Sequence, residues 1–86
     1  MIFIMPAAGT YAFWMKDMQF PLDIIWLREG KIIDIASRVP PVAPGTPDEQ
    51  MPRYAARLPI DAVVEVVAGT VDRLGVKIGD EVKIVK

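Results

Sequence analysis

The chain alternates short apolar runs with turns marked by glycine and proline, a pattern typical of a small β protein. Residues 1–5 form an apolar run that ends at Pro6, and residues 10–16 form a second run rich in aromatic side chains. Both runs favour strands. We therefore expect residues 1–5 and 10–16 to pair with each other across the intervening Ala7–Gly9 turn.

A β-hairpin is the firmest local prediction. Two further apolar runs, at residues 22–28 and 31–38, flank the dipeptide Glu29-Gly30. A glycine in a two-residue connection can adopt the positive φ that tight hairpins need. We expect these two runs to be neighbouring antiparallel strands.

Regular structure should stop between residues 39 and 59, which hold six of the eight prolines. Proline fixes φ and lacks an N–H group, so the segment cannot form a central strand or an uninterrupted helix. We expect a long loop here. Loops of this length in small domains often cover a binding site or form mobile segments, but a solvated insertion is the simpler explanation of the sequence.

Order returns after the loop. Residues 62–67 are β-branched and apolar enough for a strand buried on both faces except near Glu65. A short helix is expected at residues 70–75, with Thr70 as its N-cap and a glycine at its end. Residues 81–85 should form a last strand.

Length and composition indicate one domain over residues 1–86 with a single core. The chain is 52% apolar and 24% charged, which excludes a disordered protein. We expect a mainly β fold, α+β by content, built as a compact, barrel-like small sheet with one short helix.

Charge and residue usage exclude several classes of function. The net charge is −1 and the basic residues are scattered, so we expect no nucleic-acid partner. Cysteine and histidine are absent, which excludes thiol nucleophiles and zinc–thiolate sites and makes histidine-dependent catalysis impossible. We expect no cofactor and no metal. No apolar run is long enough to cross a membrane, so the chain as written should be cytoplasmic. The lack of asparagine is consistent with a thermophilic source.

Two sequence blocks and several single positions carry a family resemblance: Phe13-Trp14-Met15-Lys16, Pro21-Leu22-Asp23-Ile24, Glu65, Ala68-Gly69-Thr70, Leu74-Gly75, Lys77 and Gly79-Asp80. In these residues the chain resembles the DUF192 family (domain of unknown function 192). The resemblance implies a compact, mainly β domain with a short helix. It implies no established reaction, cofactor or catalytic residue.

The chain departs from the family pattern in three places. Family members usually carry a further N-terminal segment, often with a secretion signal, which leaves the cellular location open. Asp17 and Met18 stand where asparagine and threonine are usual after the lysine. The middle loop holds prolines where many members have cysteines, so chemistry that depends on those groups is not carried over.

A polar cleft is the candidate site. Trp14 and Lys16 share one face of an extended segment. If the hairpin turn sets the register, Ile25 lies opposite Asp34, which places Asp34 on the same face of the sheet as Asp23. The expected cleft is covered by the long loop, walled by a tryptophan, Trp14 or Trp26, and lined by Lys16, Asp23, Asp34 and Arg38. A structural ion pair between Lys16 and Asp23 explains the same residues.

Three functions fit this pattern. The first is a non-catalytic module that binds a small ligand or a peptide in the cleft. The second is a minimal enzyme, a hydrolase or lyase, that uses Lys16 and Asp23 as proton donor, acceptor or electrostatic stabiliser. The third is a structural domain that completes a partner's sheet. Residues 1–5 should form an exposed sheet edge, through which we expect a homodimer.

Overall fold

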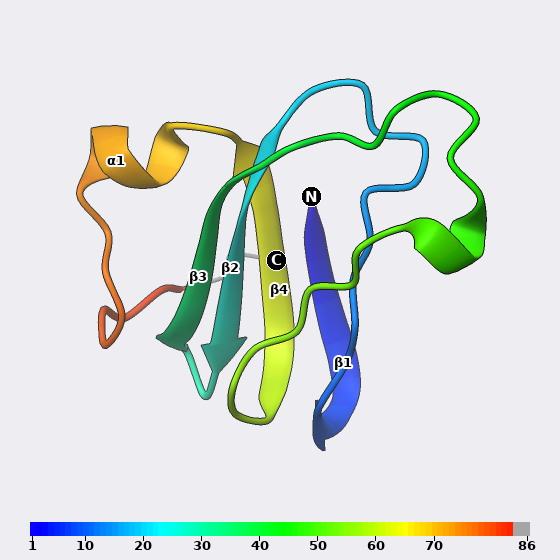
Figure 1. Cartoon of the computed structure of the whole chain (residues 1–86). Coiled ribbons are helices and arrows are strands. Elements are labelled where there is room, and N and C mark those ends of the chain that lie inside the picture. The colour runs from blue at the N-terminus through cyan, green and yellow to red at the C-terminus, as the bar shows by residue number, and fades with distance from the viewer. Residues whose placement is uncertain (84–86) are drawn as a thin grey trace.

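The computed structural model describes residues 1–83. Within them it contains a four-stranded antiparallel sheet, one short α-helix and one 3-10 turn (Figure 1). The elements are β1 (Ile2–Gly9), β2 (Leu22–Arg28), β3 (Lys31–Val39), η1 (Asp48–Gln50), β4 (Ile60–Val67) and α1 (Thr70–Leu74). The strands follow the order β1-β4-β2-β3, so β1 and β3 are the edges. The mainly β prediction is confirmed, but the sheet is open where a barrel-like sheet was expected.

The β2–β3 hairpin lies where it was predicted, with Glu29 and Gly30 at positive φ in its turn. Its register differs from the expected one. Leu27 pairs with Ile32, whereas its neighbour Trp26 pairs with Asp34, so Ile33 is an extra residue in β3. Such a bulge turns the side chains that follow it to the opposite face, here as far as a second register shift between Ala36 and Val39. The expected pairing of Ile25 with Asp34 is therefore wrong.

The N-terminal strand pairs with β4 and not with residues 10–16. It also continues past Pro6 to Gly9, with a shift in register after Ile4. Edge strands tolerate proline because its missing N–H can face solvent. Residues 10–16 form no regular strand, and they contribute one isolated bridge between Phe13 and Tyr54 of the long loop.

The N-cap of the short helix is Gly69, one residue before the expected N-cap Thr70. Gly69, in a left-handed conformation, precedes the first turn, and the hydroxyl of Thr70 instead donates to the carbonyl oxygen of Val67. Gly75 ends the helix with φ of 68°, as predicted. Its N–H donates to the carbonyl oxygens of Val71 and Asp72.

The chain after α1 lies along the outer edge of β3. Glu81 forms an isolated bridge with Lys31, and the N–H of Val82 donates to the carbonyl oxygen of Gly30. The expected strand at 81–85 is limited to this bridge in the described residues, and its last two positions lie outside them. The segment covers one end of the β3 edge, while β1 forms the opposite edge of the sheet (Figure 1).

Two apolar clusters hold the fold together, one on each face of the sheet. Residues 10–21 and the long loop cover the first face, where Met15, Ile24 and Trp26 are almost completely buried. The second face packs Leu27 and Ile32 against Val71 of α1. In residues 1–83, no helix has the length and apolar character needed to cross a bilayer.

The long loop is confirmed as the irregular part of the chain. Between Val39 and Ile60 the described structure has only the η1 turn, the Ala43–Thr46 turn and the Phe13–Tyr54 bridge. It packs more closely than its composition predicts, because Tyr54 and Ala56 contact the first cluster. The loop is thus a lid over the core face of the sheet.

Candidate functional site

The contacts of Asp23 give it a structural role. Its side chain is 1% exposed and accepts three hydrogen bonds from backbone N–H groups. Arg38 in β3 donates to one oxygen at 2.8 Å, and Gly69 and Val71 donate to the other at 3.1 and 2.9 Å. The carboxylate thereby ties the start of α1 to two strands. Because its oxygens are occupied by the backbone, they are not available to a ligand.

Lys16 does not reach Asp23. Its Nζ forms an exposed ion pair with Asp48 at 3.0 Å and lies 5.0 Å from the ring centre of Trp14. The guanidinium of Arg53 lies over the same ring at 4.1 Å. The predicted Lys16–Asp23 pair is therefore wrong. Asp48 replaces Asp23 because Lys16 lies in a turn beneath the long loop and not in a strand beside β2.

Asp34 lies on the opposite face of the sheet from Asp23, a consequence of the β3 bulge. Its carboxylate accepts bonds from the Arg57 backbone N–H and guanidinium at 3.0 and 3.1 Å, and from the Ile35 N–H at 3.0 Å. Burial alone would raise the pKa of Asp34. The three sets of hydrogen bonds and the Arg57 charge outweigh it and lower that pKa below its ordinary value of 3.8.

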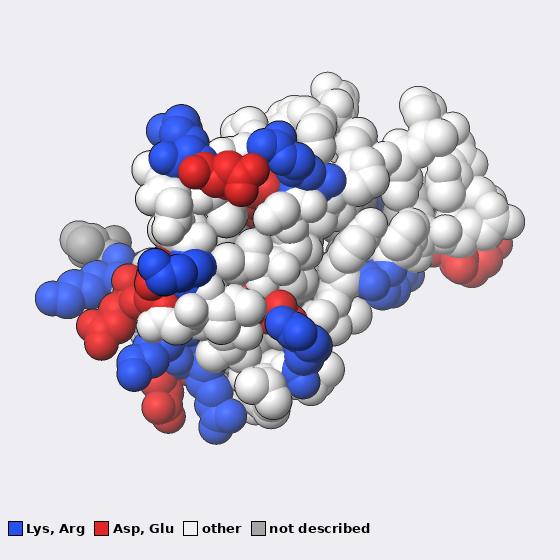
Figure 2. All heavy atoms as spheres, turned by 60° about the vertical axis from the view of Figure 1, so that its left-hand side comes forward, with Lys and Arg blue, Asp and Glu red and all other residues white. Residues whose placement is uncertain are grey.

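Arg38 contributes to the Asp23 cluster only through its backbone. Its side chain forms an exposed ion pair with Asp72 of α1 at 2.9 Å. Figure 2 shows the α1 side of the molecule, where blue and red side chains are interspersed and no broad patch has one sign. Trp26 is buried in the core at 2% exposure and walls no cleft. The five predicted site residues thus fall into three separate clusters.

One part of the predicted cleft exists around Lys16. A polar hollow of about 410 Å³ lies between the turn after Trp14 and the long loop. Lys16, Asp17 and Gln19 line one side, and residues 42–46 with Asp48 line the other. The long loop lines this hollow beside Lys16, but the Lys16 side chain is 39% exposed and Asp48 already neutralises the cation. In the described part of the chain, no three acidic side chains gather to hold a metal ion.

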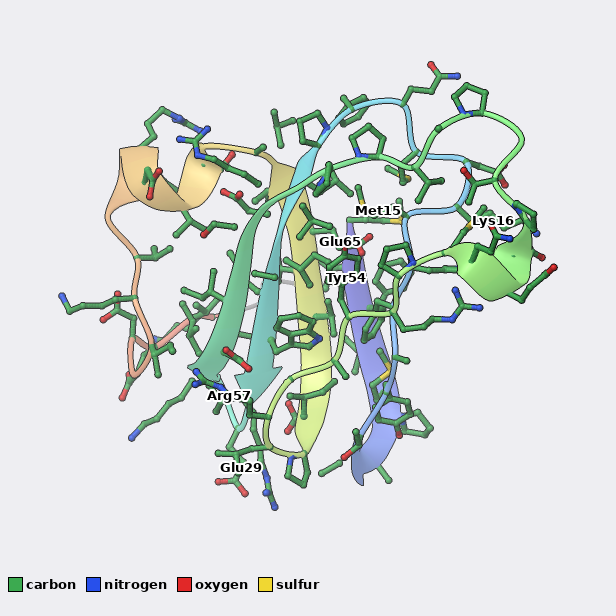
Figure 3. All side chains as sticks on the ribbon, viewed as in Figure 1. Met15, Lys16, Glu29, Tyr54, Arg57 and Glu65 are labelled. Atoms are coloured by element: carbon green, nitrogen blue, oxygen red, sulfur yellow. The ribbon has the colours of Figure 1, made fainter. Side chains whose placement is uncertain are left out.

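A second cavity, which sequence reasoning did not identify, has about 540 Å³. It lies at the end of β4 that extends beyond the start of β1. Its lining is mainly apolar and includes one buried carboxylate, that of Glu65, and we call it the Glu65 pocket: Met1, Met18, Phe20, Leu22, Glu65, Val66, Val67, Thr70 and Arg73. Glu65 follows Val63 by two positions, so both side chains lie on the face of the sheet that carries Met15 (Figure 3).

The Glu65 carboxylate is buried without a hydrogen-bond donor. Its residue is 9% exposed, and no side chain or backbone N–H among residues 1–83 donates to it. In the described chain, Trp26 Nε1 is the one fully buried side-chain N or O atom without a hydrogen-bond partner. The Glu65 oxygens also lack a partner, so they are not fully buried. The carboxylate therefore opens onto the pocket.

Burial raises the pKa of Glu65 above its ordinary value of 4.5, and the positive α-amino group of Met1 offsets part of that rise. The same amino group donates to the backbone carbonyl oxygen of Glu65 at 2.6 Å. A buried acid with a raised pKa in a cleft is a common property of functional sites. The signal in the sequence was its position as the one charged residue in the otherwise apolar run of residues 62–67.

Comparisons with known proteins agree with this architecture. The model of the DUF192 family, described as "Uncharacterized ACR", matches residues 1–84. A crystal structure of a protein of unknown function from Novosphingobium aromaticivorans DSM 12444 is similar at 31% identity with a TM-score of 0.82, over 96% of this chain and 55% of that chain. A putative transcription regulator from Sinorhizobium meliloti 1021 is similar at 31% identity and a TM-score of 0.80, over 93% and 57%. The chain thus spans little more than half the length of either structure. The comparison with curated proteins gave no match.

Proposed function

We propose that this chain, which belongs to the uncharacterised DUF192 family, is a non-catalytic binding domain whose ligand occupies the Glu65 pocket. The observation that carries the proposal is the buried Glu65 carboxylate that faces a cavity and accepts no hydrogen bond within residues 1–83. A buried polar group without a partner costs stability, and ligand sites are where such groups are commonly retained.

The lining of the pocket indicates the chemical class of the ligand. Its volume of about 540 Å³ lies in the range of small-molecule sites. Met18, Phe20 and Leu22 offer apolar walls, and Glu65 offers a hydrogen-bond acceptor that can carry a negative charge. We infer a small apolar ligand that carries an amine, with its N–H groups directed at Glu65.

The enzymatic alternative has less support from the geometry. It needed Lys16 and Asp23 as a cooperating pair, but Lys16 is paired with Asp48 and Asp23 is bound to backbone N–H groups. In the Glu65 pocket the other charged groups are the exposed guanidinium of Arg73 and the α-amino group of Met1, both opposite in sign to Glu65. These groups include one acid and no second group placed to exchange a proton with it, so binding through Glu65 has more support than proton transfer.

Hexylammonium is a suitable probe, with hexanol and hexanoate as neutral and anionic controls of the same length. We expect hexylammonium to shift the backbone NMR signals of Leu22, Val66 and Val67, hexanol to shift them less and hexanoate least. Glu65→Gln keeps the shape of the side chain but removes its charge. It should weaken hexylammonium binding by about tenfold, the loss expected for one charge-assisted hydrogen bond.

Glu29→Gln is the matched control, because Glu29 is an exposed acid in the hairpin turn, away from the pocket (Figure 3). It should bind hexylammonium as the unchanged chain does. Binding should also strengthen as pH rises through the raised pKa of Glu65, since the carboxylate form attracts the cation. The proposal fails if Glu65→Gln binds hexylammonium with unchanged affinity, or if the shifted signals lie outside the pocket.

A further inference from the structure

The first residues of β1 form an apolar sheet edge. Met1, Ile2 and Ile4 are 67%, 52% and 56% exposed, and Phe3 is 37% exposed. On its inner side β1 pairs with β4, and among residues 1–83 no strand pairs with its outer side. Large apolar side chains and free backbone groups therefore occur together on one short segment, a combination that favours strand pairing.

The free backbone groups of this edge belong to Ile2 and Ile4. Met1 exchanges both of its backbone bonds with Glu65, at 2.6 and 2.8 Å. In an antiparallel ladder such bonded pairs alternate along the strand, so Phe3 is the next residue bonded to β4. The N–H and C=O groups of Ile2 and Ile4 consequently point outward, away from the sheet.

The chemistry of the edge permits two copies to meet. Natural edge strands commonly carry charged residues that prevent pairing, but residues 1–15 contain no charged side chain. The features that do limit pairing come later in the strand: Pro6 lacks an N–H, and the register shifts between Ile4 and Gly9. Pairing is thus confined to the segment centred on Phe3.

We propose that the chain forms a homodimer in which two β1 edges pair antiparallel about a two-fold axis at Phe3. In this register Ile2 of one copy lies opposite Ile4 of its partner. The outward N–H and C=O groups of both residues are then satisfied in each copy, which gives four new hydrogen bonds. The result is a continuous eight-stranded sheet, since each copy contributes four strands.

The packing supports a weak dimer. Ile2 and Ile4 pair with Val64 and Ala62, so they lie on the α1 face, and there they would contact the same residues of the second copy. A hollow of about 440 Å³ beside Ile4, with Leu27 and Ala62 in its lining, is open to a partner side chain on this face. So short a strand buries on the order of a few hundred Å² per copy, less than the roughly 800 Å² of a standard interface. Association should therefore need high concentration.

Cysteine cross-linking tests the register, because the chain has no cysteine of its own. Phe3→Cys would place two sulfurs at the two-fold axis, in a non-hydrogen-bonded pair whose Cα separation suits a disulfide. We expect mild oxidation to cross-link Phe3→Cys rapidly. Ile2→Cys should cross-link slowly, because residue 2 of one copy lies opposite residue 4 of the other. Leu74→Cys should also cross-link slowly, because Leu74, which is 62% exposed, lies on α1 away from the edge.

Sedimentation from micromolar to millimolar concentration tests the association without altering Phe3. The unchanged chain should become dimeric over this range, and Ile4→Lys should weaken the dimer by about tenfold or more because it adds a charge to the edge. Leu74→Lys, an equally exposed change, should associate as the unchanged chain does. A chain that stays monomeric at millimolar concentration overturns the proposal and leaves the edge to a strand of another protein. A dimer that cross-links equally at all three cysteines overturns the register.

Discussion

Asp23 and Lys16 are seven positions apart in the sequence, and the fold gives them unrelated roles. The 1% exposed carboxylate of Asp23 joins β3 to the start of α1, whereas Lys16 lies in an exposed turn and pairs with Asp48. The sequence could predict that Asp23 accepts hydrogen bonds from backbone N–H groups, because a carboxylate at the start of a strand can reach free N–H groups. The partner of Lys16 could not be predicted, since it depends on the path of the long loop.

The two residues should differ in their effect on stability. Asp23→Ala leaves three backbone N–H groups without their acceptor, so the free energy of unfolding should fall by on the order of 3–5 kcal/mol. Lys16→Met loses an exposed ion pair and the contact of its Nζ with the Trp14 ring, and it should cost about 1 kcal/mol or less. Urea denaturation measures both changes.

The double variant separates this arrangement from a Lys16–Asp23 pair. Because the two side chains share no partner, their effects should add within about 0.5 kcal/mol. Asp48→Asn provides the matched control and should resemble Lys16→Met. If the double variant loses much less free energy of unfolding than the two single variants together, the two residues interact directly, contrary to the structure.

At the scale of elements, strands and turns could be predicted better than the pairing between them. The hairpin at Glu29-Gly30 and the helix end at Gly75 follow from local backbone preferences, and both are confirmed. The bulge at Ile33 has no glycine or proline to mark it, so the predicted register was wrong and Asp34 does not share a face with Asp23 as the predicted cleft required. The partner of β1 likewise depends on β4, which is more than fifty residues away in sequence.

Hydrogen exchange should distinguish the parts of the long loop. We expect the amides of residues 42–53 to exchange fast, since the described loop has only the η1 turn and the Ala43–Thr46 turn in this range. The amides of Phe13 and Tyr54 should exchange much more slowly, because each donates to the other's carbonyl oxygen at 2.7 Å. Backbone amides of β4 that pair with β2 should be the slowest of all.

Amide exchange followed by NMR provides the measurement, and the Tyr54 amide serves as the internal comparison for its own loop. Fast exchange at Phe13 and Tyr54 would show that the loop does not hold the aromatic segment to the core. Protection throughout residues 42–53 at the level of β4 would contradict the description of the loop as irregular.

For the whole molecule, the family and the mainly β fold could be predicted from the sequence, and the closure of the sheet could not. Composition and motif spacing determine how many strands can form, but an open sheet differs from a barrel only in whether its edges meet. Here Pro6 and the register shift of β1 interrupt one edge, and the chain after α1 covers part of the other. The position of the Glu65 pocket depends on the same arrangement, because β4 extends past the start of β1.

Two buried acids should give the global stability opposite dependences on pH. The lowered pKa of Asp34 means that the folded chain releases this proton more readily than the unfolded chain. Asp34 therefore stabilises the fold above its ordinary pKa of 3.8, and this contribution is lost as pH falls through the lower folded pKa. The raised pKa of Glu65 has the reverse effect: its folded form holds the proton more tightly, so stability falls as pH rises above 4.5 until the folded pKa has been passed.

Urea denaturation over a range of pH tests both signs in one series. Asp34→Asn should flatten the acid side of the stability profile, whereas Glu65→Gln should remove the fall above pH 4.5 and raise the free energy of unfolding near neutrality. Glu29→Gln, which changes an exposed acid, should leave the profile as it is. A Glu65→Gln profile that still falls above pH 4.5 would show that another group causes the loss. The buried carboxylate would then cost the fold nothing at neutral pH, and its retention would need no ligand to explain it.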